Sequence, residues 1–502
     1  MFRAVLQNLQ IVSNKTFVIS IIIQASCFLA FGCSPQGSTI EPEHNLKYQK
    51  EALALDISIS LSNPTLLEQF TRQWMLESGG TIELKQSGQL ADFRGDLAIV
   101  ATDELPALAA TGNYVPVPGF IRSDLQHTFQ WHGLFQPYSG QLSSWGGMEY
   151  GLPLSGEGRI FVYRKDRFQA ARLEPPTTWE DFVAIAETLT SLGQPALIPL
   201  SAHSLELETE FFTIAACYDR RALSQAEVQE AIKDPDSANR ILSFQYGLKT
   251  YQPRIESPAF SHALNIMRRL MPLRARNAAG GPAKALAAGE ASMGIVSLKE
   301  FFLLIHADPA LKNHIGIASV PGSRFTFDFF TGERLSNRAN AVNRIPYLGF
   351  AGWTGMVRKT CENPAMAWDF LSAIADPDKF GSEMMIAGHW GIGPNRFAQL
   401  EERGRHLWYN YDLNRENTEK MISCLKDQIQ SQIANQCYRL RLPNVGEHTR
   451  VFDQVIRPAL LDAKEDGSRV LSQVADGWNQ LWRDIPMEKK QMWIRMSCGL
   501  AH

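Results

Sequence analysis

The sequence reads YGLPLSGEGRIFVYRKD at residues 150–166 and PTTWEDF at residues 176–182. The apolar run at 158–163 predicts a β-strand. The paired threonines before Trp179 predict the N-cap of a helix that runs to about Leu192. Two acidic residues fall in its first turn, where the helix dipole favours negative charge. Together the two stretches predict a strand and a helix that belong to a second structural unit, which begins near Tyr150.

The same alternation of strand and helix extends in both directions from this point. Strands are expected at residues 52–59, 81–85, 97–101, 292–296 and 315–320. Helices are expected at 64–77, 104–111, 257–271, 282–289, 363–374, 449–463 and 467–482. The stretch 203–210 carries His and Glu and is expected to be a polar, exposed helix. This order predicts an α/β fold with a largely parallel sheet.

Length and composition favour two lobes and exclude several kinds of site. The chain has 502 residues, which is too long for one hydrophobic core. Its net charge is −3 and it has no basic domain, so no nucleic-acid partner is expected. None of the seven cysteines forms a CxxC pair or a zinc-like cluster, and neither a metal nor another cofactor is expected. Cys424 and Cys437 form either a disulfide or two part-buried thiols.

The N-terminus has the features of an export signal. Residues 1–15 carry Arg3 and Lys15 but no acidic residue, and an apolar run follows at 16–31. This order predicts a signal peptide over residues 1–32. A permanent membrane helix is the alternative, but the run is short for a bilayer and polar residues interrupt it.

The end of this signal resembles a lipobox, the motif in which a cysteine receives a diacylglycerol. Ala30, Phe31 and Gly32 precede Cys33, which is the expected site of lipidation. Cys27 fits less well, because Gln24 would occupy the apolar position of the motif. Residues 33–48 then form a lipidated tether, and the protein is expected on a membrane that faces the periplasm or the cell exterior.

Several segments in order resemble one family, the extracellular solute-binding proteins of ABC importers, in the branch of sugar binders that includes maltose-binding protein. Residues 150–166 and 176–182 resemble its hinge strand and the helix start that follows. The other matching blocks are DLAIVATD at 96–103, AGEASMGI at 288–295, IGIASVPG at 315–322, GWTGM at 352–356 and NPAMAWDF at 363–370.

The resemblance implies a two-lobed periplasmic-binding-protein fold of type II, with a ligand cleft between lobes joined by crossing strands. Lobe 1 would comprise residues 49–154 and 352–392, and lobe 2 residues 155–351 and 393–484, with an unassigned tail at 485–502. It implies capture of a carbohydrate or related small polar solute by hinge closure. The implied partners are ABC permease subunits with a separate ATPase, and no phosphate-binding loop is present in the sequence.

The family pattern also points to ligand-binding residues around the hinge. Those expected to contact the solute are Ser60, Ser62, Asn63, Asp103, Ser155, Glu157, Arg159, Lys299, Trp353 and Trp390. Two of these residues could equally have a structural role. Asp103 could cap a helix, and Trp353 could be an aromatic residue of the core. Arg159 could instead pair with Glu157. Lys299 stands near the place of a stacking tryptophan, and this departure admits an acidic or phosphorylated solute.

Two other functions remain open. A solute sensor that signals to a membrane receptor would use the same ligand residues. A carbohydrate-active enzyme would use Glu157 and Asp103 as a carboxylate pair. The resemblance assigns binding, so we expect no enzyme activity.

Overall fold

The computed structural model describes most of the chain after residue 46. The described residues are 47–49, 51–57, 64–86, 90–219, 244–247, 250–276, 281–328, 331–337, 341–345, 352–378, 393–409, 413–434, 437, 439, 441–462 and 464–497. The expected signal peptide, Cys33, Ser60, Ser62, Asn63 and Trp390 lie outside these ranges. No helix within the described ranges combines the length and the apolar character that a bilayer crossing requires.

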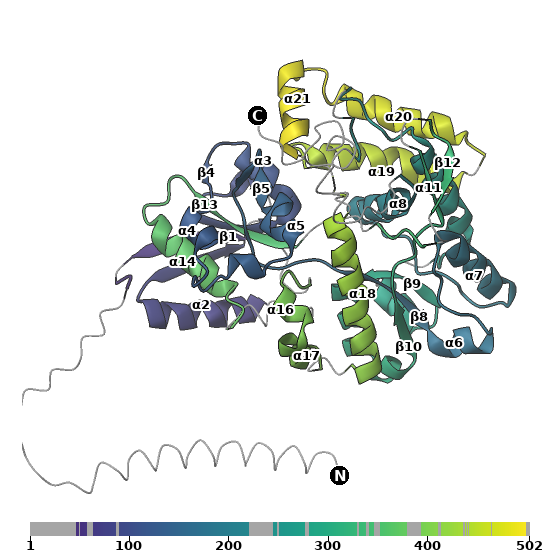
Figure 1. Ribbon diagram of the computed structural model, residues 1–502, viewed down its shortest axis with the longest axis horizontal. Coiled ribbons are helices and arrows are strands. Elements are labelled where there is room, and N and C mark those ends of the chain that lie inside the picture. Colours follow the sequence, from purple (N-terminus) through teal and green to yellow (C-terminus); the bar gives the residue numbers. More distant parts are fainter. Residues whose placement is uncertain are drawn as a thin grey trace, which may run out of the picture. The chain divides into compact units, whose positions relative to one another are not determined.

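The first sheet contains strands from both ends of the folded region (Figure 1). Its order is β2-β1-β3-β13-β4, and β7 also pairs with β13. The strands are β1 (Ala52–Ile57), β2 (Thr81–Gln86), β3 (Leu97–Ala101), β4 (Tyr114–Val115), β7 (Leu152–Pro153) and β13 (Trp353–Arg358). β1 is parallel to β2 and β3, as predicted. β13 runs antiparallel to β3 and returns the late part of the chain to this sheet.

Helices α2 (Pro64–Ser78) and α14 (Pro364–Ile374) pack on this sheet through apolar side chains. The rings of Trp74 and Phe370 meet edge to face at 5.1 Å. Asn363 caps α14 by accepting the N–H of Met366 at 2.9 Å. The apolar residues whose spacing predicted both helices therefore face the same core.

The second sheet has the order β10-β8-β9, with β8 (Arg159–Arg164) between β9 (Met293–Ser297) and β10 (Ile315–Ala318). Both pairs are antiparallel, so the prediction of a largely parallel sheet is wrong here. The rule that strand–helix–strand units run parallel applies to strands that one crossover joins. β8 is separated from both neighbours by long helical segments, and the sequence pattern does not fix its direction.

Helix α7 (Trp179–Ser191) begins as the sequence predicts. The Thr178 hydroxyl accepts the N–H of Asp181 at 3.1 Å, and the Asp181 carboxylate accepts the N–H of Thr178 at 3.0 Å. This reciprocal capping box satisfies two backbone donors that the first turn leaves unpaired.

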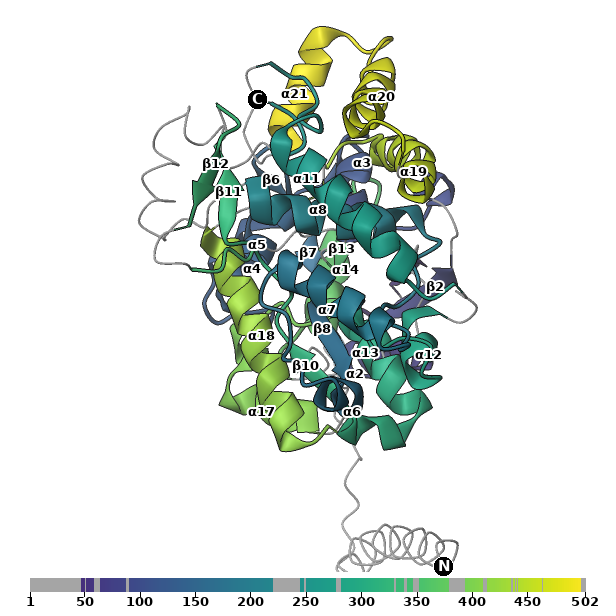
Figure 2. The same ribbon diagram turned by 90° about the vertical axis from the view of Figure 1, so that its right-hand side faces the viewer.

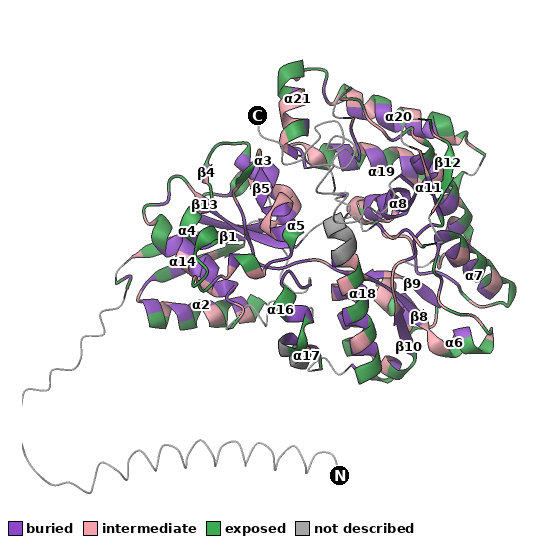
Figure 3. Ribbon diagram, viewed as in Figure 1, coloured by how far each residue is buried: buried purple, intermediate pink, exposed green. Residues whose placement is uncertain are grey.

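Helices α8 (Ser204–Asp219) and α11 (Pro258–Leu270) lie side by side (Figure 2). α19 (Val445–Leu461) and α20 (Gly467–Gln480) complete the same apolar core. From Leu207 onward α8 is almost entirely buried, as its colour in Figure 3 shows. The expectation of an exposed polar helix at 203–210 is therefore wrong. Phenylalanines on this helix supply the apolar surface that buries it, and they lie just beyond the polar stretch.

The opposite side of the second sheet is covered by α13 (Leu298–Ala307) and α18 (Arg415–Ala434). The tail left unassigned by the sequence contains helix α21 (Met487–Ser497). The Ser497 hydroxyl accepts the N–H of Arg441 at 2.9 Å, and its carbonyl accepts from Gln141 Nε2 at 3.1 Å. Trp493 packs against the core that holds α8 and against a cluster beside β3. The tail is thus part of the folded structure.

Candidate functional site

Two chain segments meet at Ser155 and Trp353, at the end of the antiparallel pairing between β7 and β13, and we call this contact the crossing. The Ser155 hydroxyl accepts the N–H of Trp353 at 3.2 Å, and the Trp353 carbonyl accepts the N–H of Leu154 at 2.8 Å. Gly352 has φ +86°, and a Cβ there would lie 2.0 Å from the Ser155 carbonyl oxygen. Trp353 is only 5% exposed within the core of the first sheet, which agrees with the core role that the sequence left open.

Glu157 and Arg159 follow this crossing and form an ion pair. Arg159 Nε lies 3.2 Å from Glu157 Oε1, and Nη2 lies 3.0 Å from Glu206 Oε2 in the first turn of α8. The ion pair between Arg159 and Glu157, which the sequence left open, is therefore present in the structure. Burial disfavours the charged guanidinium, but Glu206, Glu157 and Glu300 outweigh it and raise the pKa of Arg159.

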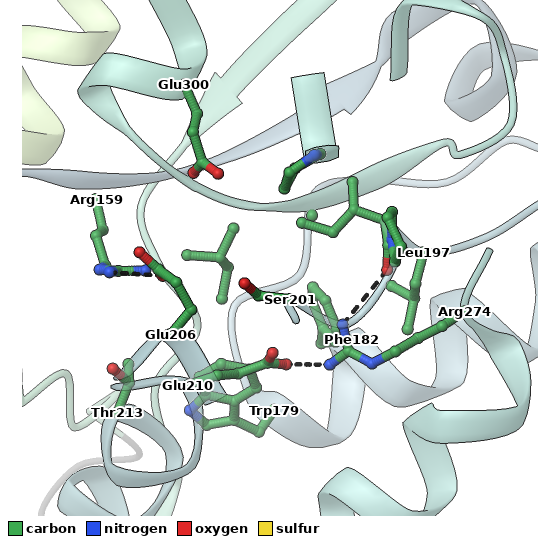
Figure 4. A pocket seen from close by; sticks show the side chains of 15 residues that line it. Arg159, Trp179, Phe182, Leu197, Ser201, Glu206, Glu210, Thr213, Arg274 and Glu300 are labelled. Atoms are coloured by element: carbon green, nitrogen blue, oxygen red, sulfur yellow. Dashed lines mark hydrogen bonds and ion pairs between the residues drawn. The ribbon is translucent and has the colours of Figure 1, made fainter. Parts of the chain in front are cut away.

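Arg159 lines a small pocket beside the second sheet and helix α8, with a volume of about 50 Å³ (Figure 4). Its polar wall contains Glu206 and Glu210 from α8, Arg274, Glu300 and the hydroxyl residues Ser201 and Thr213. Arg274 forms an ion pair with Glu210. The apolar wall includes Trp179, Phe182, Leu197, Ile198, Pro199 and Ile295.

Glu300 enters the pocket from the start of α13. Its Oε2 accepts the N–H of Ser297 at 3.0 Å and the Ser297 hydroxyl at 3.2 Å. Burial and then the nearby charge of Glu206 raise the pKa of Glu300. Lys299, the neighbour that the sequence favoured, is half-buried and is not among the residues that line the pocket.

The sequence reasoning missed Glu206, Glu210, Arg274 and Glu300. One signal was available for the first two: their spacing places both carboxylates on the same face of a helix. That signal was discounted because the helix was expected to be exposed. The contact between this face and Arg274 links residues 64 positions apart, and local pattern does not encode it.

Asp103 follows β3, as predicted, but a basic residue of the chain itself binds it. Arg439 Nη1 lies 2.5 Å from Asp103 Oδ2, and Arg439 Nε lies 3.4 Å from Glu208 Oε1. Burial raises the pKa of Asp103, although the nearby Arg439 acts in the opposite direction. The local cap is Glu104, whose carboxylate accepts the N–H of Ala101 at 3.2 Å, so the helix-cap role considered for Asp103 belongs to its neighbour.

No disulfide joins Cys424 and Cys437 in the structure. The two side chains lie in different apolar clusters, and Cys424 Sγ accepts a hydrogen bond from the Ser319 hydroxyl at 3.5 Å. The Cys424–Cys437 disulfide that the sequence left open is therefore absent from the structure, and both side chains are buried.

Residues 76–379 match the model of a protein family described as bacterial extracellular solute-binding protein. This chain belongs to that family. Because the family is extracellular and its members bind solutes, this is an exported solute-binding protein. No curated protein matches this solute-binding protein by sequence.

Solved structures with the same fold cover most of this solute-binding protein. A solute-binding protein from Agrobacterium radiobacter, in complex with ribitol, has a TM-score of 0.62 at 16% identity, covering 86% of this chain and 99% of its own. A cyclic maltosyl-maltose binding protein from Arthrobacter globiformis has a TM-score of 0.61 at 17% identity, with the same coverage. The sugar-binding protein MalE from Xanthomonas citri has a TM-score of 0.60 at 12% identity, covering 86% of this chain and 98% of its own. The fold is the two-lobed type II fold of periplasmic binding proteins, as the sequence predicted.

Proposed function

We propose that this protein is the solute-binding subunit of an ABC importer, and that its solute is a carbohydrate or a related small polyol. The observation that carries the proposal is the pocket beside Arg159, where ionised side chains and an apolar wall meet next to the chain crossing. Proteins of the same fold include one bound to ribitol and one bound to α-D-tagatose.

The chemistry of the pocket suits a polyhydroxylated molecule. Carboxylates of Glu206, Glu210 and Glu300 accept hydrogen bonds from hydroxyl groups, and the guanidiniums of Arg159 and Arg274 donate them. The ring of Trp179 and its apolar neighbours offer a surface for C–H groups. A few polar groups within a mostly apolar concave wall are typical of small-molecule sites.

Capture would proceed by closure of the two lobes around the solute. We place such a hinge at the crossing of Ser155 and Trp353, where the backbones of the two segments are held together. The lobe boundaries expected from the sequence, 49–154 with 352–392 and 155–351 with 393–484, remain part of this proposal. The closed form would deliver its solute to permease subunits driven by a separate ATPase.

The protein would be held at the membrane by acyl chains on Cys33. Two acyl chains suffice for stable anchoring, since each buried methylene contributes about 0.8 kcal/mol. The polar tether at residues 33–48 would let the lobes reach the permease.

Thermal unfolding of the purified full-length chain in detergent tests the solute assignment. The panel contains neutral sugars, polyols, amino sugars, sugar acids and sugar phosphates. A ligand at about 100 times its Kd stabilises the folded state by about 2.7 kcal/mol, which gives a clear rise in Tm. We expect at least one sugar or polyol to produce this rise, and stabilisation by none of them would refute the proposal.

A further inference from the structure

The pocket beside Arg159 has more negative than positive side chains. Among the described residues, its guanidiniums are those of Arg159 and Arg274. The carboxylates are Glu206, Glu210 and Glu300 in the wall and Glu157 behind Arg159. Each guanidinium is already engaged, Arg159 between Glu157 and Glu206 and Arg274 with Glu210. Among these described residues, carboxylates therefore outnumber guanidiniums before any solute enters.

Glu300 is the carboxylate of the pocket that feels the charge of Arg159 without forming a direct ion pair with it. No lysine, arginine or histidine in the described part of the chain lies within ion-pair distance of it. Both of its hydrogen bonds come from Ser297 and go to Oε2. Figure 4 shows its carboxylate pointing toward the side of the pocket where Glu206 and Arg159 lie. Glu300 is half-buried and shares the charge of Arg159 with Glu157 and Glu206, so its own negative charge is compensated only in part, and the remainder is costly in a partly desolvated site.

A ligand cation would offset this cost better than a neutral hydroxyl. An ammonium group has three donors and a compact point charge, and hydrogen bonds between charged groups are about twice as strong as neutral ones. An anionic solute would meet like charge from Glu300 and Glu206. In the sequence, Lys299 was the residue that made an acidic or phosphorylated solute conceivable, but it is not among the residues that line the pocket.

Resting on the proposed function, we infer that the solute is an amino sugar or amino polyol whose ammonium group binds at Glu300 beside Glu206. The hydroxyl groups of the same molecule would be bound by the remaining polar side chains of the pocket.

Calorimetric titration of the full-length chain with matched pairs of solutes tests this inference. The pairs are glucosamine with glucose, galactosamine with galactose, mannosamine with mannose, and glucamine with sorbitol; N-acetylated forms serve as amines without charge. In a pair that binds, we expect the amine to bind about tenfold more tightly than its hydroxyl partner, and acetylation to remove the gain. Equal or weaker binding of the amine overturns the inference and leaves the proposed function standing. Failure of every pair overturns this inference, and the wider thermal-unfolding panel then decides whether the proposed function stands.

The variant Glu300→Gln locates the ammonium group. Glutamine also serves in a capping box, so α13 should still begin at Ser297. The ratio of amine to hydroxyl affinity should fall about tenfold in this variant. Glu290→Gln is the matched control, because Glu290 is exposed on the turn before β9 and should keep the ratio. If the melting temperature shows that Glu300→Gln does not fold, Glu206→Gln takes its place with the same expected fall. An unchanged ratio in the folded variant contradicts the assignment.

Discussion

Arg439 donates to Asp103 at 2.5 Å, across 336 residues of sequence. The same guanidinium reaches Glu208 on α8 and donates to the Thr449 hydroxyl on α19 at 2.5 Å. Asp103 follows a strand of the first sheet, whereas Glu208 and Thr449 belong to helices that pack in the core beside the second sheet. One buried cation of the chain thus joins the end of β3 to α8 and α19 and takes the carboxylate that the family pattern assigns to the ligand.

Arg439→Met should strongly destabilise the protein. The side chain of Arg439 is 4% exposed, and its removal leaves Asp103 and Glu208 buried without their cation. Loss of one partner from a buried ion pair costs about 3–5 kcal/mol. Arg450→Met is the control, since its pair with Glu447 is exposed and should contribute at most about 1 kcal/mol. Urea unfolding measures both, and equal losses would show that the buried network does not stabilise the fold.

Stability should fall as the pH decreases from about 6.5 to 4, through protonation of His448. Its ring is buried, and the tautomer that fits its contacts accepts from the Tyr246 hydroxyl at 3.2 Å and donates to the Asn444 carbonyl. Burial lowers the pKa of His448 to about 4, from 6.5 in the unfolded chain. Because the folded state disfavours the proton, its contribution is complete above pH 6.5 and is lost toward pH 4.

The loss from this one group is about 3 kcal/mol, from about 1.36 kcal/mol for each unit of pKa difference. We expect His448→Gln to flatten the stability profile between pH 6.5 and 4, as measured by urea unfolding at a series of pH values. The exposed His132→Gln should leave the profile unchanged. A profile for His448→Gln that still has the wild-type slope would rule out His448 as the titrating group.

Cys33→Ser should abolish fatty-acid labelling of the protein in cells. The lipobox-like residues before Cys33 predict that this thiol carries the acyl chains. Cys27→Ser is a matched control in the same segment and should keep both the label and the membrane association. Retained label in Cys33→Ser, measured after growth with a labelled fatty acid, would place the anchor elsewhere.

Local chemistry made several elements predictable. The capping box at Thr178 and Asp181 lies within four residues, and the sequence placed the start of α7 correctly. The strand expected at 158–163 is β8 at Arg159–Arg164. Glu157 and Arg159 are two positions apart, so their pairing could be proposed from the sequence.

The features that the sequence did not predict depend on contacts between distant segments of the chain. The direction of β9 and β10 beside β8 follows from the tertiary path of the chain. The burial of α8 depends on α11 and α19, which come later in the sequence. Asp103 was correctly placed after its strand, but nothing near it in sequence indicates Arg439. A local pattern identifies side chains that suit a site, and only the fold decides which of them already have a partner.

Gly352→Ala should disrupt the crossing of the two chain segments. Gly352 has φ +86°, where an alanine costs about 1–2 kcal/mol, and its Cβ would also lie 2.0 Å from the Ser155 carbonyl oxygen. That oxygen is backbone and cannot rotate away, so the segments must separate and the Ser155–Trp353 hydrogen bond must break. Gly112→Ala is the control, because its φ is +71° but no atom lies within 4 Å of the new Cβ. We expect Gly352→Ala to lose clearly more unfolding free energy than Gly112→Ala and to weaken solute binding, which the control should retain. Equal losses in urea unfolding would mean that the φ angle alone requires this glycine and that the close approach of the two segments does not matter.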